Sequence, residues 1–393
     1  MKPRRLLLEL FDAALRAVDG RASVNRELRH FGHGPHAIFA FGKAASAMAR
    51  GALDALGDHI SQVLVITKDG HGDPELRRDV RVTVLESAHP VPDERSLMAG
   101  AELERRIAAL SLREFPIFLV SGGSSSLVEA LHEGVTLGQL RALNERGLAS
   151  GWNITQLNAE RARLSRLKAG GVARLLGQRD AYAFFISDVP HDDPAVIGSG
   201  LLGPDPGGAD LVTRRVIADV DMAARAVRDG GRSHGLDIRL RLARFAGDEQ
   251  DVASDFVAQL RDCEGDGLVW GGESTVALPV QPGRGGRNQH LALAAARALR
   301  TNDDFTILAA GTDGTDGLTE DAGAMVDART MERAELAGVD VERALRDFDS
   351  GTALEAAGDL VHTGPTGTNV GDILVGIRHS GRRLRDLAPP RMF

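Results

Sequence analysis

The sequence predicts an α/β protein with two domains: helices cover a mostly parallel sheet in the first domain, and a second α/β domain follows it. Short apolar runs rich in β-branched and aromatic residues alternate along the chain with segments of helical period, which is typical of βαβ units. The chain has 393 residues, more than one hydrophobic core usually supports. We therefore expect an N-terminal domain over residues 1–235 and a C-terminal domain over residues 236–393.

The N-terminal domain is predicted to open with an amphipathic helix over residues 1–15, because Glu9 and Asp12 interrupt the apolar run too early for a signal peptide. Helical period is also present at 96–110 and, as one long segment, at 210–231. Five buried strands are expected in this domain: AIFAF at 37–41, QVLVIT at 62–67, RVTVL at 81–85, PIFLVS at 116–121 and AYAFFIS at 181–187.

The C-terminal domain is predicted to repeat this alternation. It follows the glycine-rich segment GGRSHG at 230–235, which is typical of a boundary or loop. Its expected strands are DIRLR at 237–241, GLVWGG at 267–272, STVALPV at 274–280, FTILAAG at 305–311 and DILVGI at 372–377.

Composition excludes several classes of protein. A net charge of −8 and a pI of about 5.9 argue against sequence-independent binding to nucleic acid. No run of about 20 apolar residues is present, so no membrane span is predicted. The single cysteine, Cys263, excludes an intrachain disulfide and a multi-cysteine metal site, and it indicates a reducing, cytoplasmic location.

Lysine is rare in this chain, which makes one lysine informative. Among 47 Lys and Arg residues only four are lysines, and Lys43 lies in FAFGKAAS directly after an expected strand. Ligands of parallel α/β sheets bind beyond the carboxyl ends of the strands, and a cation at a helix N-terminus favours an anion there. Lys43 is therefore a candidate anion-binding residue; the alternative is an exposed cation in a first turn.

The turn SGGSSS follows another expected strand and is a candidate phosphate cradle. Glycine lets backbone amides approach an anion closely, and hydroxyls add donors or meet Mg²⁺. A tight turn with a serine N-cap is the alternative, and the Walker pattern is absent. The turn leads from a strand toward an expected helix through Ser121, Gly122, Gly123 and Ser124.

Acidic residues follow two further strands. Asp188 comes directly after a strand with Asp192 close behind, and Asp313 lies in the glycine-rich segment AAGTDGTDG. Such carboxylates suit Mg²⁺ coordination or general-base catalysis, although solvated turn acids are the alternative. A calcium loop is not supported, because Ala324 stands at the twelfth position counted from Asp313.

Three further motifs contain candidate ligand-binding residues. Arg287 opens an expected helix in GRGGRNQHLAL and could bind an oxyanion or phosphate, or be one more exposed arginine. Glu273 lies in GGESTV, and Asn369 lies in the loop HTGPTGTNVGDIL. The letters at 198–203 match GxGxxG, but they begin ten residues past the end of the strand and Pro204 follows, so a dinucleotide site is not supported there.

Taken together, these motifs resemble the two-domain glycerate 2-kinase family, some members of which are labelled hydroxypyruvate reductase. The resemblance extends from about residue 36 to 376. It implies phosphorylation of D-glycerate at its 2-hydroxyl by ATP with Mg²⁺, in a cleft between a Rossmann-like N-terminal domain and a smaller α/β C-terminal domain. The motifs are, in order, FGKAASAMA, TKDGHG, HPVPDERS, SGGSSSL, SDVPHDDPAVIGSG, GGESTV, GRGGRNQHLAL, AAGTDGTDG and TGPTGTNVGDI.

The resemblance also implies roles for individual residues. Lys43 and Arg287 would neutralise phosphate and substrate charge, and Asp188 would act as metal ligand or base. The implied metal ligands are Asp188, Asp192 and Asp313. The implied substrate or nucleotide contacts are Ser121, Gly122, Gly123, Ser124, Glu273, Asp313 and Asn369.

Two departures from the family pattern leave the acceptor open. His191 stands where the family commonly has glycine, and Leu201 stands where it commonly has proline. The alternatives are a kinase for a longer sugar acid, an NAD(P)H-dependent hydroxypyruvate reductase and a non-catalytic sensor of nucleotide or sugar acid. The expected partners are small molecules, glycerate and ATP, with no nucleic acid or membrane. Phosphorylation at O2 or O3 and the oligomeric state, a homo-oligomer included, stay open.

Overall fold

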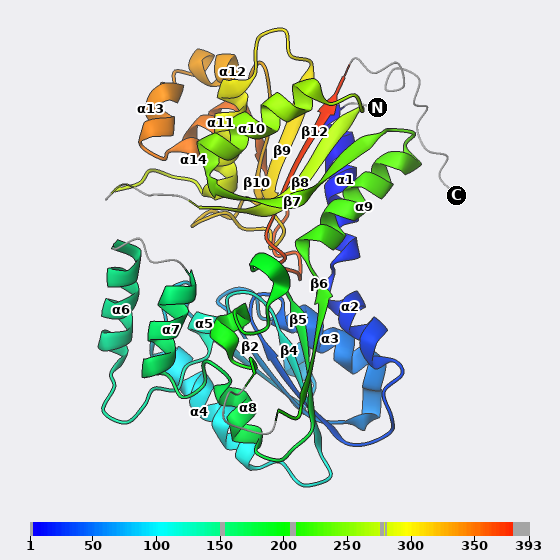
Figure 1. The fold of residues 1–393 in the computed structure, drawn as a ribbon, viewed down its shortest axis with the longest axis vertical. Coiled ribbons are helices and arrows are strands. Elements are labelled where there is room, and N and C mark those ends of the chain that lie inside the picture. The colour runs from blue at the N-terminus through cyan, green and yellow to red at the C-terminus, as the bar shows by residue number, and fades with distance from the viewer. Residues whose placement is uncertain (1–2, 150–153, 205–209, 276–278, 280, 380–393) are drawn as a thin grey trace. The chain divides into compact units, whose positions relative to one another are not determined.

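The structure is a computed structural model that describes residues 3–149, 154–204, 210–275, 279 and 281–379. The chain divides into two compact units (Figure 1). We call Val18–Asp219 with Gly367–Val370 the Rossmann unit, and Met1–Ala17, Val220–Thr366 and Gly371–Phe393 the mixed-sheet unit. None of the described helices is long and apolar enough to cross a membrane.

The Rossmann unit is built on a parallel sheet of six strands in the order β3-β2-β1-β4-β5-β6. In this order the chain reverses direction across the sheet between β1 and β4, and the turns after these two strands therefore border the crevice where such sheets bind ligands. The strands are β1 (His36–Phe41), β2 (Ile60–Lys68), β3 (Val82–Ser87), β4 (Phe115–Val120), β5 (Ala181–Ile186) and β6 (Val212–Ala218).

Helices cover both faces of this sheet. In Figure 1, α2 and α3 lie on one face and α4 and α8 on the other. All six residues of β1 are buried, because a parallel strand between two helical layers has no solvent face. The helices are α2 (Gly20–Leu28), α3 (Ala45–Leu56), α4 (Glu94–Ala108), α5 (Ser124–Leu127), α6 (Leu137–Ala149), α7 (Ile154–Leu164) and α8 (Gly171–Leu176), with 3₁₀ turns η1 (Gly57–His59), η2 (Leu76–Arg78), η3 (Pro190–Asp192) and η4 (Ile197–Gly200).

The mixed-sheet unit also has six strands, in the order β11-β10-β9-β12-β8-β7. Only β7 and β8 pair in parallel; the other neighbours are antiparallel. Its elements are α1 (Pro3–Ala17), α9 (Val220–Ser233), β7 (Ile238–Asp248), α10 (Glu249–Asp262), β8 (Gly267–Thr275), α11 (Arg287–Ala298), β9 (Phe305–Gly311), β10 (Gly323–Asp327), α12 (Thr330–Leu336), α13 (Val341–Arg346), α14 (Ser350–Ala357), β11 (Leu360–Val361) and β12 (Asp372–Arg378).

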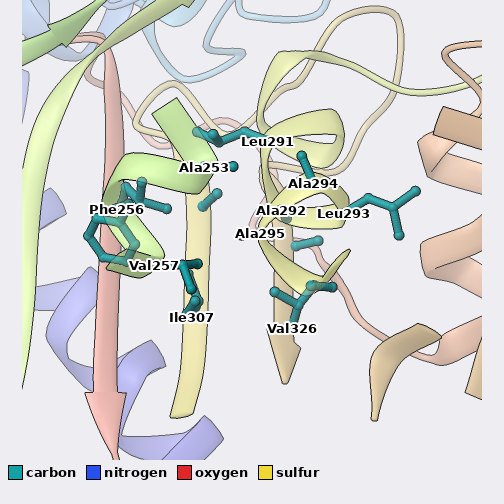
Figure 2. Packing of buried hydrophobic residues seen from close by; sticks show 14 of the residues in the cluster. Ala253, Phe256, Val257, Leu291, Ala292, Leu293, Ala294, Ala295, Ile307 and Val326 are labelled. Carbon is teal, nitrogen blue, oxygen red and sulfur yellow. The ribbon is translucent and has the colours of Figure 1, made fainter. Parts of the chain in front are cut away.

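The core of this unit lies between helices α10 and α11 and the sheet (Figure 2). Phe256 and Val257 of α10 pack with Ile307 of β9, and all three are fully buried. On α11 the alanines at 292, 294, 295 and 296 are small enough to let the helix approach the strands closely. This packing places the first turn of α11, and with it Arg287, firmly beside the sheet.

Two sequence predictions about the fold need correction. The long helix expected at 210–231 is strand β6 followed by helix α9, because the β-branched residues of Val212–Ala218 pair with β5. Strands β10 and β11 were not predicted at all. For the expected strand at 274–280, residues 274 and 275 end β8, and residues 276–278 and 280 lie outside the described part of the chain.

The two compact units do not divide at residue 235, where the sequence predicts the domain boundary. Helix α9 packs against α1 and against β7 and β8, so residues 220–235 join the mixed-sheet unit. Helix α1 joins the same unit, where Arg4 forms an ion pair with Asp359. Helices α1 and α9 thus belong to the mixed-sheet unit because they pack against it, although α1 precedes the Rossmann unit in the sequence.

Candidate active site

The turns after β1 and β4 are hydrogen-bonded to each other at the point where the sheet order reverses. The backbone N–H of Lys43 donates to the carbonyl of Gly122 (3.0 Å), and the N–H of Ala44 donates to the buried Oγ of Ser121 (3.0 Å). A Cβ on Gly42 would lie 2.3 Å from Ser121 Oγ, so glycine is required for this approach. The two motifs singled out in the sequence therefore form one structure.

Asp188 and Asn369 extend this site from the end of β5 and from the returning segment Gly367–Val370. Asn369 Nδ2 donates a hydrogen bond of 2.8 Å to Asp188 Oδ2. Both atoms lie against Gly122: a Cβ there would be 1.7 Å from Asp188 Oδ2 and 2.1 Å from Asn369 Nδ2. Asn369 is only 6% exposed, whereas Asp188 is half-buried.

Gly123 lies between Lys43 and His89. A Cβ at Gly123 would be 3.3 Å from Cγ of Lys43 and 3.2 Å from Nε2 of His89. The residue has a φ of 85°, a left-handed conformation that glycine adopts freely. The helix expected after this turn is the single turn α5, too short for a strong dipole, so anion binding here would depend on side chains and glycine amides.

The acidic loop after β5 has an unusual backbone. His191 and Asp192 take left-handed φ values of 62° and 54°. Asp192 lies in the same loop as Asp188, and both are among the described residues. Within those residues, no group of three or more His, Cys, Asp or Glu side chains is arranged to hold a metal ion.

The second group of predicted residues lies in the mixed-sheet unit, around Arg287. Its guanidinium forms an ion pair with Glu273 and a second one with Asp372 (Nη2 to Oδ2, 3.3 Å). These residues come together because β12 runs antiparallel between β8 and β9, which places Asp372 opposite Gly272 of β8 and opposite Gly311, the last residue of β9. The negative charge of Asp372 raises the pKa of Arg287.

The N-terminus of α11 is occupied by a carboxylate of the chain itself. Asp316 Oδ1 accepts from the N–H of Asn288 (3.0 Å) and Oδ2 accepts from the N–H of Gln289 (2.7 Å). Asp316 is 3% exposed, and burial raises its pKa to about 7. Since the amides of Asn288 and Gln289 already donate to Asp316, a ligand at the first turn of α11 would bind the side chain of Arg287.

Asp313 is placed by the turn after β9. Its Oδ1 accepts from the N–H of Thr315 (3.0 Å), and a Cβ on Gly311 would lie 3.3 Å from that oxygen and 3.4 Å from Asn288 Nδ2. Asn288 Nδ2 in turn donates to Asp372 Oδ1 (2.9 Å). Glu273, Arg287 and Asp313 thus belong to one polar cluster of the mixed-sheet unit, which also includes Asp372.

A cavity of about 650 Å³ adjoins Arg287, and we call it the Phe348 cavity. The rings of Phe348 and His290 stack in its wall, with centroids 4.3 Å apart and planes at 13°. His290 is 2% exposed, its Nε2 has no hydrogen-bond partner among the described residues, and burial lowers its pKa to about 4. The lining of the Phe348 cavity includes Gly283, Arg284, Arg287, His290, Leu318 and Phe348.

The GxGxxG match at 198–203 is not a dinucleotide fingerprint in the structure. Its first three residues, Gly198, Ser199 and Gly200, lie in the 3₁₀ turn η4 and all have left-handed φ values. The match neither directly follows a strand nor opens a helix. Ser199 is 5% exposed, and its Oγ is hydrogen-bonded to Ser125 and Asn158. This turn supports the β4 turn.

Sequence reasoning missed several residues of these sites. Asp372 and Asp316 stood inside motifs already quoted, but nothing in one sequence shows which acid of a motif is buried beside Arg287. Lys168, one of the four lysines, is fully buried in an ion pair with Glu129. Arg161 gave no signal, because arginine is abundant throughout the chain.

Comparison with known proteins agrees with this fold and these motifs. Residues 6–229 match a domain of unknown function, DUF4147, and residues 267–372 match the MOFRL family. D-glycerate 2-kinase of Thermotoga maritima is 31% identical over 95% of this chain and 98% of its own length. A relative from Agrobacterium vitis, provisionally named a hydroxypyruvate reductase, is 34% identical over 94% of this chain and 93% of its own.

A solved structure extends the likeness to the whole fold. The crystal structure of glycerate kinase from Thermotoga maritima superposes with a TM-score of 0.84 at 30% identity, covering 95% of this chain and 99% of that chain. Fold and motifs together define a two-domain α/β enzyme. The chain belongs to the glycerate 2-kinase family, so the resemblance and the fold class predicted from the motifs are confirmed.

Proposed function

We propose that the protein phosphorylates D-glycerate at its 2-hydroxyl with ATP, yielding 2-phosphoglycerate and ADP. The main support is the group of residues at the switch point of the Rossmann unit, where the Lys43 turn, the Ser121–Ser124 turn and the Asp188–Asn369 pair adjoin one another. The names of family members such as the Thermotoga maritima enzyme support the same reaction.

For this reaction the protein must bring two anions, ATP and D-glycerate, together and must neutralise the charge that spreads over the transferred phosphoryl group. The 2-hydroxyl oxygen forms a bond to the γ-phosphorus, the bond from that phosphorus to the ADP oxygen breaks, and the hydroxyl proton must leave. Lys43 would act as a compact, mobile positive charge. Asp188 would accept the proton or hold the metal, and Asn369 would orient its carboxylate.

Mg²⁺ would supply positive charge between the phosphate oxygens of ATP. Carboxylate oxygens are the hard ligands that Mg²⁺ prefers, and it usually binds one or two carboxylates together with substrate phosphates and water. Asp188, Asp192 and Asp313 offer such oxygens. This mode of binding does not need a ready-made group of three protein ligands.

We further propose that ATP places its nucleoside part in the Phe348 cavity, with phosphates toward Arg284 and Arg287. A cavity of about 650 Å³ is within the usual range for ligands of this size. The stacked rings of Phe348 and His290 offer an aromatic wall to a base. An active site made by both domains stays a prediction, and it requires Lys43 and Arg287 to serve one reaction.

The direct experiment is ADP release from ATP and Mg²⁺ with and without D-glycerate, alongside NADH loss with hydroxypyruvate on the same preparation. Glycerate-dependent ADP release with no NADH loss is the expected result. NADH loss without ADP release would favour the reductase, which the position of the GxGxxG letters opposes. Binding of both ligands without turnover would favour a sensor. A cytoplasmic location also stays a prediction.

A further inference from the structure

The Rossmann unit contains a second, small cavity of about 150 Å³, which we call the Arg161 cavity. It shares His89 and Gly123 with the site beside Lys43, so it borders the place where phosphoryl transfer is proposed. The polar residues of its lining that matter here are His89, Ser125, Glu129, Asn144, Arg161 and Lys168.

Arg161 is a charged side chain in this wall that forms no ion pair of its own among the described residues, because Glu129, the carboxylate whose charge acts on it, is paired with Lys168. On helix α7, its Nε donates to Asn144 Oδ1 (2.8 Å) and its Nη1 lies 3.5 Å from Asn158 Oδ1. Both partners are neutral amides, and within the described residues no Asp or Glu lies at ion-pair distance. Burial lowers the pKa of Arg161, although an arginine keeps its charge in proteins.

The other charges of the cavity cancel. Lys168 Nζ donates to Glu129 Oε2 (2.8 Å) and to the carbonyl of Ser125 (2.8 Å), and Lys168 and Glu129 are 1% and 0% exposed. Since this pair is neutral as a unit, the lining has the excess positive charge of Arg161. A buried charge is costly unless a counter-ion accompanies it, so the cavity is suited to an anion.

The wall of the cavity is also held in place around this charge. Ser125 Oγ and Ser199 Oγ are 2.6 Å apart, and Ser199 Oγ donates to Asn158 Oδ1 (2.8 Å). Ser199 and Ala169 take left-handed φ values of 59° and 48°, which non-glycine residues adopt at a cost. Such backbone strain persists only where the surroundings impose it.

The volume of the Arg161 cavity limits the size of the ligand that it can bind. A cavity of about 150 Å³ can hold a molecule of the size of benzene, which is similar to a three-carbon hydroxy acid. A nucleotide or a six-carbon aldonate is much larger. Leu140 of helix α6, which is 2% exposed, also lines the cavity.

We propose that the Arg161 cavity is the acceptor site, where the guanidinium of Arg161 binds the carboxylate of a short 2-hydroxy acid and the cavity volume excludes longer sugar acids. The proposal rests on the proposed kinase function. It orients the acid with its carboxylate in the cavity and its hydroxyl toward Gly123 and Lys43.

The test compares Arg161→Met with Arg163→Met, a matched change on the same helix, where the exposed Arg163 pairs with Glu160. Steady-state ADP release should show a KM for D-glycerate raised about tenfold or more in Arg161→Met, with the KM for ATP unchanged. Arg163→Met should match the wild type. Arg161→Lys keeps the charge without the fork and tests the same point if Arg161→Met does not fold.

Calorimetric titration of D-glycerate without nucleotide separates this proposal from the proposed function. If the wild type binds D-glycerate and Arg161→Met binds it at least tenfold more weakly, the site stands even where no ADP is released. Equal binding by both proteins, or no binding by the wild type, overturns it. Turnover of D-gluconate as efficient as that of D-glycerate overturns the size limit.

Discussion

Asn369 donates a hydrogen bond of 2.8 Å to Asp188 across 181 positions of sequence. The segment Gly367–Val370 thus returns from the C-terminal third of the chain to complete a site formed by the turns after β4 and β5. Thr368 fixes this segment, since its buried Oγ1 donates to the carbonyl of Val18. The hydrogen bond from the amide of Asn369 thus fixes the orientation of the Asp188 carboxylate.

If Asp188 has the proposed role, Asp188→Asn should lower kcat about 100-fold or more, because the change removes either the base or a metal ligand from the proposed site of phosphoryl transfer. Asp180→Asn, at the exposed opposite end of β5, is the matched control and should keep wild-type kinetics. The pH profile distinguishes the two roles: loss of a base removes the acidic limb of kcat, whereas loss of a ligand raises the Mg²⁺ concentration needed for half activity. Unchanged kcat in a folded Asp188→Asn protein would contradict both.

Lys43→Met should lower kcat by about 100-fold or more, the effect expected when a charge partner of the transition state is removed. Lys43→Arg keeps the positive charge but should restore little, because Cγ of Lys43 lies only 3.3 Å from the Cβ position of Gly123 and a planar guanidinium cannot take the same place. Stopped-time ADP assays at saturating ATP and D-glycerate measure both variants. Near-normal turnover of Lys43→Met would exclude Lys43 from the reaction.

Much of the fold and part of the site could be predicted from the sequence. The buried strands of the Rossmann unit are apolar on both faces, so the runs at 37–41 and 116–121 identify β1 and β4 without other information. Strand β6 was missed because it is an edge strand with Arg214 and Arg215 on it, and its apolar positions do not form a continuous run.

The site was predictable where chemistry follows directly on a strand, as at Lys43 and Asp188. It was not predictable where distant segments meet: the Arg287, Glu273 and Asp372 cluster depends on the antiparallel position of β12 between β8 and β9, which no local pattern encodes. Arg161 could not be identified as a site residue from the sequence for a different reason. The proposed role of Arg161 depends on the absence of an ion pair with Asp or Glu among the described residues, and only the packing of α7 shows that.

His191→Gly should stabilise the Rossmann unit by about 1 kcal/mol, because His191 holds a left-handed φ of 62° that costs a residue with a side chain about 1–2 kcal/mol, partly offset by the greater freedom of glycine in the unfolded chain. Gly70→Ala is the converse test, since Gly70 has a φ of 77° with open space around it and should lose about 1 kcal/mol. Urea unfolding at neutral pH measures both, and a loss of stability in His191→Gly would show that its side chain has a stabilising contact.

Asp316 should make the stability of the mixed-sheet unit depend on pH. Burial raises the pKa of this carboxyl from 3.8 to about 7, so between about pH 4 and pH 7 the folded state holds a proton that the unfolded chain has lost. The free energy of unfolding should therefore fall as pH rises through this window, by up to about 1.4 kcal/mol per pH unit for one proton. Above about pH 7 both states are ionised and this dependence ends.

Asp316→Asn removes that titration but also one acceptor oxygen, since the carboxylate accepts from the amides of both Asn288 and Gln289. The variant should be less stable than the wild type at pH 5, because an unpaired amide costs about 1–3 kcal/mol, and the difference should narrow or reverse by pH 8. Urea unfolding of both proteins at pH 5, 6, 7 and 8 checks this. Parallel curves of unfolding free energy against pH would mean that Asp316 is ionised throughout, stabilised at the N-terminus of α11 by the two amides and by Arg287.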